Sequence, residues 1–215
     1  MESFKNVCGG DILFSMVKAI QNNKEYLGEI DGLIGDGDHG MNMNKGFTLF
    51  ETRYREESFS FTEGLENLGN ILFSEIGGSM GPIYGTILMD MATASTDKED
   101  ITLPVLNDML AAGLNGLQEI VEAKVGDKTL VDTLSPAVDV LQIGINRNMK
   151  FADTLNEMKK AAEKGRDSTK ELVAKYGRSS RLGERSRGVL DAGAVSCCII
   201  LKSMADAICL KLLDE

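Results

Sequence analysis

The sequence predicts an all-α protein of eight helices in antiparallel, up-and-down order. Apolar residues recur at spacings of three and four along almost the whole chain, which is the periodicity of one helix face. No run alternates apolar and polar residues as a half-buried strand does, and the connections between the proposed helices are short. We therefore expect one helical domain over residues 1–215, without a sheet.

Eight segments carry the helical pattern, and three prolines support the starts of three of them. Pro82, Pro104 and Pro136 each fall near the first turn of a proposed helix, where a missing backbone N–H breaks no helical hydrogen bond. In chain order, the predicted helices lie near residues 12–20, 43–54, 63–76, 81–95, 106–121, 132–146, 151–176 and 194–212.

The charge balance limits the partners. The formal net charge is −10, so nucleic acid and acidic membrane surfaces would be repelled overall, and a bound phosphate needs a metal ion or a local basic cluster.

The four cysteines show no C-x-x-C spacing and are expected to be reduced thiols. The first residues do not resemble a secretory signal, and no uninterrupted apolar run reaches about 18 residues. We expect a cytoplasmic protein without a nucleic-acid or membrane partner.

Helix packing leaves four Gly-rich or polar stretches unexplained. They fall at junctions between predicted helices, and alternate junctions of an antiparallel bundle share one end. This topology allows some of them to converge on one site. The four stretches are residues 28–46, 77–86, 126–133 and 177–196.

The first stretch is acidic. Asp31, Asp36 and Asp38 lie within eight positions and precede His39, the only histidine. Carboxylates so close together repel one another unless a cation binds them, and Mg²⁺ suits a few carboxylates combined with phosphate oxygens. A solvated acidic loop is the alternative.

Three other motifs are excluded for this stretch. Its glycines spell G-x-G-x-x-G, but no strand precedes them. An EF-hand starting at Asp36 would have Phe47 in place of its glutamate, and no P-loop motif is present.

The second stretch is rich in glycine and ends in proline at a predicted helix start. Gly77, Gly78, Ser79 and Met80 precede Gly81 and Pro82. Backbone N–H groups at a helix N-terminus can bind phosphate whatever the side chains are. A tight turn between two helices explains the same residues.

The third and fourth stretches are less specific. By itself the GDKT stretch is structural: Asp127 and Thr129 can orient a helix start, Asp132 can act as its N-cap, and Leu130 offers an apolar cover for a base. In the fourth stretch, arginine forks suit phosphate oxygens, although pairing with surface glutamates would also explain them. Asp191, Ala192 and Gly193 can cap the last helix or hold a ribose. The four arginines are Arg178, Arg181, Arg185 and Arg187.

Taken together, an acidic metal site, a glycine cradle, an apolar cover and an arginine are what a magnesium nucleotide requires. In this order the stretches resemble the nucleotide-binding L subunit of dihydroxyacetone kinase. The equivalent domain also forms the C-terminal half of single-chain, ATP-dependent dihydroxyacetone kinases. GDGDHGMNMNKGF and GRSSRLGERSRG carry the resemblance, GDKT and GG-x-x-GP support it, and it extends from about residue 8 to the C-terminus.

The resemblance implies an eight-helix antiparallel barrel with ADP or ATP at one end. It implies that Asp31, Asp36 and Asp38 bind Mg²⁺, normally two ions. The remaining residues would bind the nucleotide. The phosphates would be met by His39, Gly40, Met41, Asn42, Ser79, Met80 and Arg178, and the base and ribose by Leu130, Asp191, Ala192 and Gly193.

The resemblance also implies partners. In the phosphotransferase-system form, ADP stays bound and is rephosphorylated by a phosphohistidine M subunit, and the phosphoryl group passes to dihydroxyacetone held covalently on a histidine of a K subunit. This sequence departs from the family pattern at Met80, Val189 and Ala192, where Ser, His and Pro are usual. An ATP-exchanging subunit for another small ketose such as a tetrulose, and a non-catalytic nucleotide sensor, are the alternatives. The sequence leaves the acceptor, the phosphoryl donor and a homodimer open.

Overall fold

The computed structural model describes residues 2–214, and these form eight α-helices, three short 3₁₀ helices and two strands. Each α-helix packs against the next, and α8 packs against α1, which closes a ring. The predicted all-α fold is confirmed. The elements are β1 (Ser3–Lys5), η1 (Asn6–Cys8), α1 (Gly10–Ile34), α2 (His39–Tyr54), α3 (Phe61–Glu75), α4 (Met80–Thr93), β2 (Asp100–Thr102), α5 (Leu103–Ile120), α6 (Val131–Asn146), α7 (Phe151–Ser168), η2 (Thr169–Glu171), η3 (Arg178–Ser186) and α8 (Ala192–Asp214).

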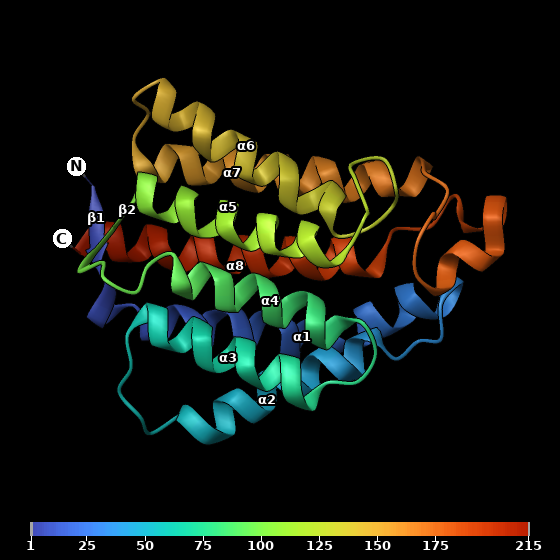
Figure 1. Cartoon of the computed structure of the whole chain (residues 1–215), viewed down its shortest axis with the longest axis horizontal. Coiled ribbons are helices and arrows are strands. Elements are labelled where there is room, and N and C mark those ends of the chain that lie inside the picture. Colours follow the sequence, from blue (N-terminus) through green and yellow to red (C-terminus); the bar gives the residue numbers. More distant parts are fainter. Residues whose placement is uncertain (1, 215) are drawn as a thin grey trace.

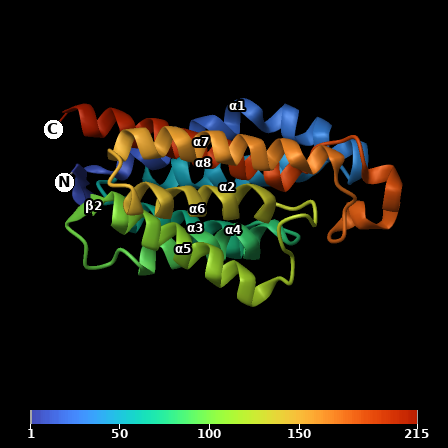
Figure 2. The same ribbon diagram turned by 90° about the horizontal axis from the view of Figure 1, so that it is seen from above.

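The helices run along the long axis of the molecule, so the barrel has two distinct ends. Figures 1 and 2 show both chain termini at one end and η3 at the other. At the η3 end, α1, α3, α5 and α7 finish and α2, α4, α6 and α8 begin. The loops of the four unexplained stretches therefore share one end of the barrel.

Local signals fix several helix starts. The Ser60 hydroxyl accepts from the Glu63 N–H at 3.1 Å, and the Glu63 carboxylate accepts from the Ser60 N–H at 2.7 Å, which is a capping box before α3. Thr102 caps α5, and Pro104 follows in its first turn. Pro136 differs from the prediction, because it is the sixth residue of α6. There its missing N–H leaves the Asp132 carbonyl without the helical donor.

The sequence-based expectation of no sheet is wrong. β1 and β2 pair antiparallel, with Phe4 opposite Ile101. Each strand has three residues, too few to show an alternating pattern. The ladder joins the start of the chain to the segment before α5, so its partners are about a hundred residues apart.

Two helix boundaries also differ from the prediction. α1 continues to Ile34, into the first part of the Gly-rich stretch, because Leu27, Ile30 and Ile34 remain buried against the core. α7 ends at Ser168 instead of Tyr176. The hydroxyl of Thr169, the next residue, donates to the Arg166 carbonyl, and the chain then turns through η2.

The last helix carries a long apolar stretch. Ala192–Leu213 is long and apolar enough to cross a membrane by composition alone, with a mean hydropathy of 1.7 over its best window. However, 61% of that window is buried inside the protein, and α8 packs against α1, α6 and α7. We therefore interpret α8 as a core helix of the barrel. The four cysteines are free thiols, as expected, and Cys197 and Cys198 on α8 are buried.

Candidate functional site

A cavity of ≈ 340 Å³ opens at the η3 end of the barrel. All four unexplained stretches contribute to its wall, so the expected convergence is found. Its acidic side comes from the α1–α2 junction, and its apolar side from the α5–α6 junction. The loop before α4 and the segment before α8 complete it.

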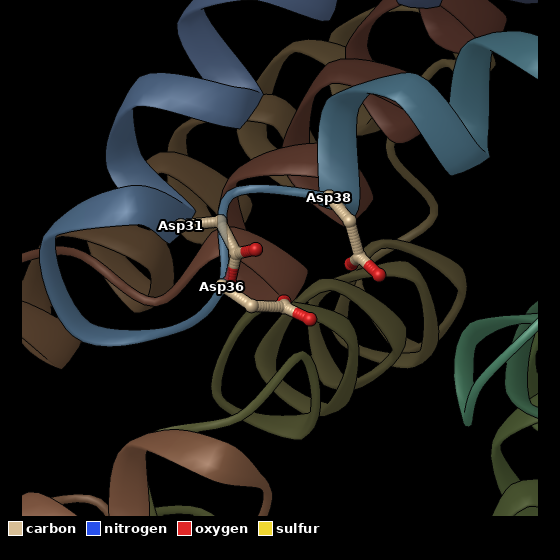
Figure 3. Close-up of side chains that lie close together, drawn as sticks. All are labelled: Asp31, Asp36 and Asp38. Atoms are coloured by element: carbon tan, nitrogen blue, oxygen red, sulfur yellow. The ribbon is translucent and has the colours of Figure 1, made fainter.

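Three carboxylates form the acidic side. Asp31 lies in the last turn of α1, Asp36 in the loop and Asp38 directly before α2. One oxygen from each lies within 4.8 Å of the others, and the three side chains converge in Figure 3. The Asp38 side chain does not cap α2, and Gly37 has a φ of 77° that a side chain would strain. An all-oxygen donor set of this kind fits Mg²⁺.

Arg178 lies against this cluster. It begins η3, lines the cavity and forms an ion pair with Asp36. Among the four arginines of its stretch, all described by the structure, Arg178 alone lines the cavity. Arg187 instead pairs with Glu184 at 3.0 Å, which is the surface pairing considered as the alternative. The tertiary structure thus separates one arginine from its neighbours.

A buried hydrogen-bond network joins His39 and Tyr84, which line the cavity, through Ser196. Nε2 of His39 lies 2.8 Å from the Ser196 hydroxyl, which lies 2.6 Å from the Tyr84 hydroxyl. Tyr84 also donates to the Gly193 carbonyl at 3.1 Å. Burial lowers the pKa of His39 to about 4, so its ring is neutral at pH 7. Tyr84 and Ser196 lie within the second and fourth stretches but were not singled out from the sequence, because no local pattern shows that their hydroxyls meet.

Of the four consecutive residues His39 to Asn42 that were predicted to meet the phosphates, only His39 reaches the cavity wall. His39 lines the cavity, and its N–H donates to Asp31 at 3.3 Å. Gly40, Met41 and Asn42 do not line the cavity. A Cβ on Gly40 would lie 1.8 Å from the Lys24 carbonyl oxygen, so this glycine permits the close approach of α1 and α2. The predicted contacts of Gly40, Met41 and Asn42 with phosphate therefore stay predictions.

The glycine-rich stretch forms an open rim. Ser79 and Met80 line the cavity at the start of α4. Gly78 has a φ of 74°, and a Cβ on Gly77 or Gly78 would meet nothing within 4 Å. Space is therefore open around the N-terminus of α4, where backbone N–H groups and the helix dipole favour an anion.

The opposite wall is aliphatic. Leu130 is 6% exposed and lines the cavity beside Leu117 and Val121. The prediction that Asp132 caps α6 is wrong, because Leu130 occupies the cap position. Instead, the Asp132 carboxylate accepts from the N–H groups of Gly126 at 2.6 Å and Thr129 at 2.8 Å. It fixes the loop that positions this wall.

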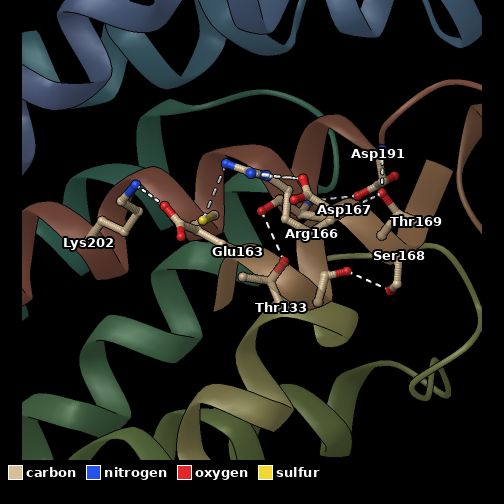
Figure 4. Close-up of polar contacts among 11 residues, drawn as sticks. Thr133, Glu163, Arg166, Asp167, Ser168, Thr169, Asp191 and Lys202 are labelled. Atoms are coloured by element: carbon tan, nitrogen blue, oxygen red, sulfur yellow. Dashed lines mark hydrogen bonds and ion pairs between the residues drawn. The ribbon is translucent and has the colours of Figure 1, made fainter. Parts of the chain in front are cut away.

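Asp191, Ala192 and Gly193 line the cavity at the start of α8. The Asp191 carboxylate accepts from the Ala194 N–H at 2.8 Å (Figure 4), so it caps the helix. Burial raises the pKa of Asp191 to about 6, although the Ala194 N–H and the Lys128 charge act in the opposite direction. Lys128 is itself only 1% exposed. Its burial was not foreseen from GDKT, since lysine side chains usually reach solvent.

A family model described as "DAK2 domain" matches residues 33–206 of this chain. This chain belongs to the DAK2 domain family. It is 36% identical over 186 residues to the ADP-binding subunit DhaL of PEP-dependent dihydroxyacetone kinase 1 from Listeria innocua, covering 86% of this chain and 88% of that subunit. It is 35% identical over 184 residues to the corresponding subunit from Escherichia coli, covering 84% and 87%. The resemblance to the L subunit is therefore confirmed.

Solved structures support the fold of this DAK2 domain. The dihydroxyacetone kinase of C. freundii in its native form has a TM-score of 0.72 and 19% identity, covering 96% of this chain and 36% of that one. The same enzyme in complex with AMP-PNP and Mg²⁺ has a TM-score of 0.70. The chain thus spans about a third of the length of these structures, and at this identity the likeness concerns the fold alone.

Proposed function

We propose that this chain is the nucleotide-binding subunit of a dihydroxyacetone kinase, which supplies a phosphoryl group from bound ATP to dihydroxyacetone on a K-type partner. One observation carries the proposal: the three aspartates, Arg178 and an aliphatic wall line the same cavity. Its relatives from Listeria innocua and Escherichia coli are named ADP-binding subunits, and this supports the choice of nucleotide.

The residues of the cavity divide the work of binding. Asp31, Asp36 and Asp38 would hold Mg²⁺, two ions by family resemblance, and the metal neutralises phosphate charge and orients the transferred group. Arg178 would turn its guanidinium from Asp36 to phosphate oxygens, which a planar fork binds well. Backbone N–H groups at Met80 would bind a further phosphate oxygen. Leu130 and its aliphatic neighbours would exclude water from the base.

The wider reaction requires two partners. A phosphohistidine M-type subunit would rephosphorylate ADP in place, and a K-type subunit would hold the substrate, with all three proteins in the cytoplasm. The named L-type subunits are 34–36% identical to this chain, whereas the named erythrulose kinases are 26–30% identical. These identities favour a separate L-type subunit over the tetrulose-kinase form, which is the second candidate. The complete carboxylate cluster argues against a sensor, which needs no such metal site.

One experiment tests the proposal. Purified protein is denatured, and any released nucleotide is identified by mass spectrometry. The protein is then reconstituted with K-type and M-type partners, and the dihydroxyacetone phosphate formed is measured. We expect retained ADP and transfer that depends on the phosphohistidine protein. Rapid exchange with free ATP and transfer to a tetrulose would favour the second candidate. Nucleotide binding without transfer to either ketose would leave the sensor.

A further inference from the structure

Residues 172–188, which we call the lid, cover the cavity from one side. They run from the end of η2 through η3 to the segment that precedes α8. Figure 1 shows this part of the chain projecting beyond the helix ends. The lid contributes Tyr176, Gly177, Arg178 and Ser179 to the cavity wall. Its burial is slight, because only Ala174 and Ser186 among its residues are buried. A segment with so little core of its own needs external contacts to stay in place.

Lys128 contacts both ends of the lid. Its Nζ donates to the carbonyl of Thr169, just before the lid, and to the carbonyl of Val189, just after it. Thr169 also accepts, through its hydroxyl, from the Asp191 N–H at 3.0 Å, as Figure 4 shows. Lys128 therefore joins the two points between which the lid leaves and re-enters the body of the protein.

This placement of Lys128 is costly in itself. A buried ammonium loses its hydration, and the φ of Lys128 is 62°, a region that residues with a side chain seldom adopt. Desolvation lowers the pKa of Lys128, and the nearby Asp191 charge partly offsets this. Both hydrogen bonds of the ammonium go to residues that flank the lid, Thr169 and Val189, and these contacts compensate for the cost.

Asp127, the residue before Lys128, contacts the lid directly. The Asp127 carboxylate pairs with Lys175 of the lid at 2.5 Å, and the Lys175 N–H donates to the Asp127 carbonyl at 3.2 Å. Asp132 fixes the loop itself through the N–H groups of Gly126 and Thr129. The GDKT loop is thus attached on one side to α6 and on the other to the lid.

We propose that residues 126–129 anchor the lid, and that Lys128 is the positioning residue that keeps Arg178 over the cavity. The anchor uses only contacts within this chain. Its consequence, slow release of the nucleotide, rests on the proposed function. When the anchor is lost, Arg178 and Tyr176 leave the cavity wall more often, and a bound nucleotide dissociates faster.

Trypsin provides the test in nucleotide-free protein, because the lid contains cleavable bonds after Lys175, Arg178, Arg181, Arg185 and Arg187. Cleavage of a briefly opened segment follows the population of its open form. In Lys128→Met we expect cleavage within the lid to rise at least about tenfold, since two charge-assisted hydrogen bonds are lost. Mass spectrometry assigns each cut. Lys202→Met is the matched control, because it removes the ion pair with Glu163 on the α7–α8 seam (Figure 4) and should leave lid cleavage unchanged.

The readout separates positioning from general stability. A merely structural role for Lys128 would lower the melting temperature and raise cleavage throughout the chain, and this result would overturn the proposal. Unchanged lid cleavage in folded Lys128→Met would overturn it as well. If Lys128→Met does not fold, Asp127→Asn decides: increased lid cleavage supports the anchor, and unchanged cleavage contradicts it.

The consequence for binding is measured separately. The dissociation rate of a fluorescent ADP analogue should rise at least about fivefold in Lys128→Met when the association rate is unchanged, and stay as in the wild type in Lys202→Met. Faster lid cleavage with an unchanged dissociation rate would retain the anchor and overturn its role in nucleotide retention. A wild-type protein that binds no analogue would overturn the proposed function, and the trypsin result would still decide the anchor.

Discussion

The two ends of the barrel are closed in different ways. At the end with the chain termini, the rings of Phe4 and Phe61 pack edge to face at 5.6 Å, and both are fully buried. The Asn6 amide donates to the Thr62 hydroxyl at 2.8 Å and accepts from the Thr62 N–H at 3.0 Å. Apolar packing and the hydrogen bonds between Asn6 and Thr62 thus seal this end.

The η3 end is built from groups that cost stability. Six glycines with positive φ are found in the described residues, and all of them lie in the loops of this end or in the lid. Three carboxylates converge there, and the half-buried Asp191 lies close enough for the charge of Asp31 to raise its pKa. One end of the ring thus stabilises the fold, while the other maintains a glycine-rich, charged site.

The largest expected effect lies at the sealed end. Phe61→Ala removes a buried ring and should lower the free energy of unfolding by about 3–5 kcal/mol, as measured by chemical denaturation. Well below the melting temperature, the dissociation constant for ADP should equal that of the wild type. A weakened affinity at that temperature would mean that the two ends are coupled.

The next effect is confined to the η3 end. Asp38→Ala should reduce phosphoryl transfer at least about a hundredfold, because the metal loses a ligand and the phosphate charge is less well neutralised. Circular dichroism should show unchanged helical content. Asp139→Ala, on the exposed face of α6, is the control and should retain activity. Near-normal transfer by Asp38→Ala would remove Asp38 from the metal site.

Asp191 tests whether the η3 end reduces stability. Its pKa is raised by burial to about 6 from an unfolded value near 3.8, so its contribution to stability is lost as the pH rises from about 4 to about 6. Asp191→Asn keeps an acceptor for the Ala194 N–H and avoids the buried charge. At pH 7 it should be more stable than the wild type, on the order of 2 kcal/mol, and this gain should vanish near pH 4. A gain independent of pH would contradict the assignment.

The smallest effect concerns the metal. Mg²⁺ bound to the three aspartates stabilises the folded state by mass action, so chelation should lower the melting temperature by about 2–4 °C for a chain of this size. Asp38→Ala should show no such decrease. If chelation leaves the wild type unchanged, the carboxylates form a solvated loop, the alternative that the sequence left open.

The contrast between the two ends also explains what could be predicted. The acidic cluster and the glycine-rich rim were identified because residues close in sequence carry each pattern, whereas Arg178 was singled out from its stretch only by the resemblance to the L subunit. Phe4 pairs with a strand almost a hundred residues away, and Lys128 reaches residues 41 and 61 positions away. No local pattern records such contacts, so the sheet and the lid anchor were not predicted.

The sequence by itself determined the helical class, most helix positions and the residue types of the cavity, because periodicity, capping and motifs act over a few residues. Only the tertiary structure decided that α7 ends at Ser168, that His39 faces Ser196 across 157 positions, and that one arginine of four reaches the carboxylates. These outcomes depend on which helices become neighbours when the ring closes, and that choice is made by packing across the whole chain.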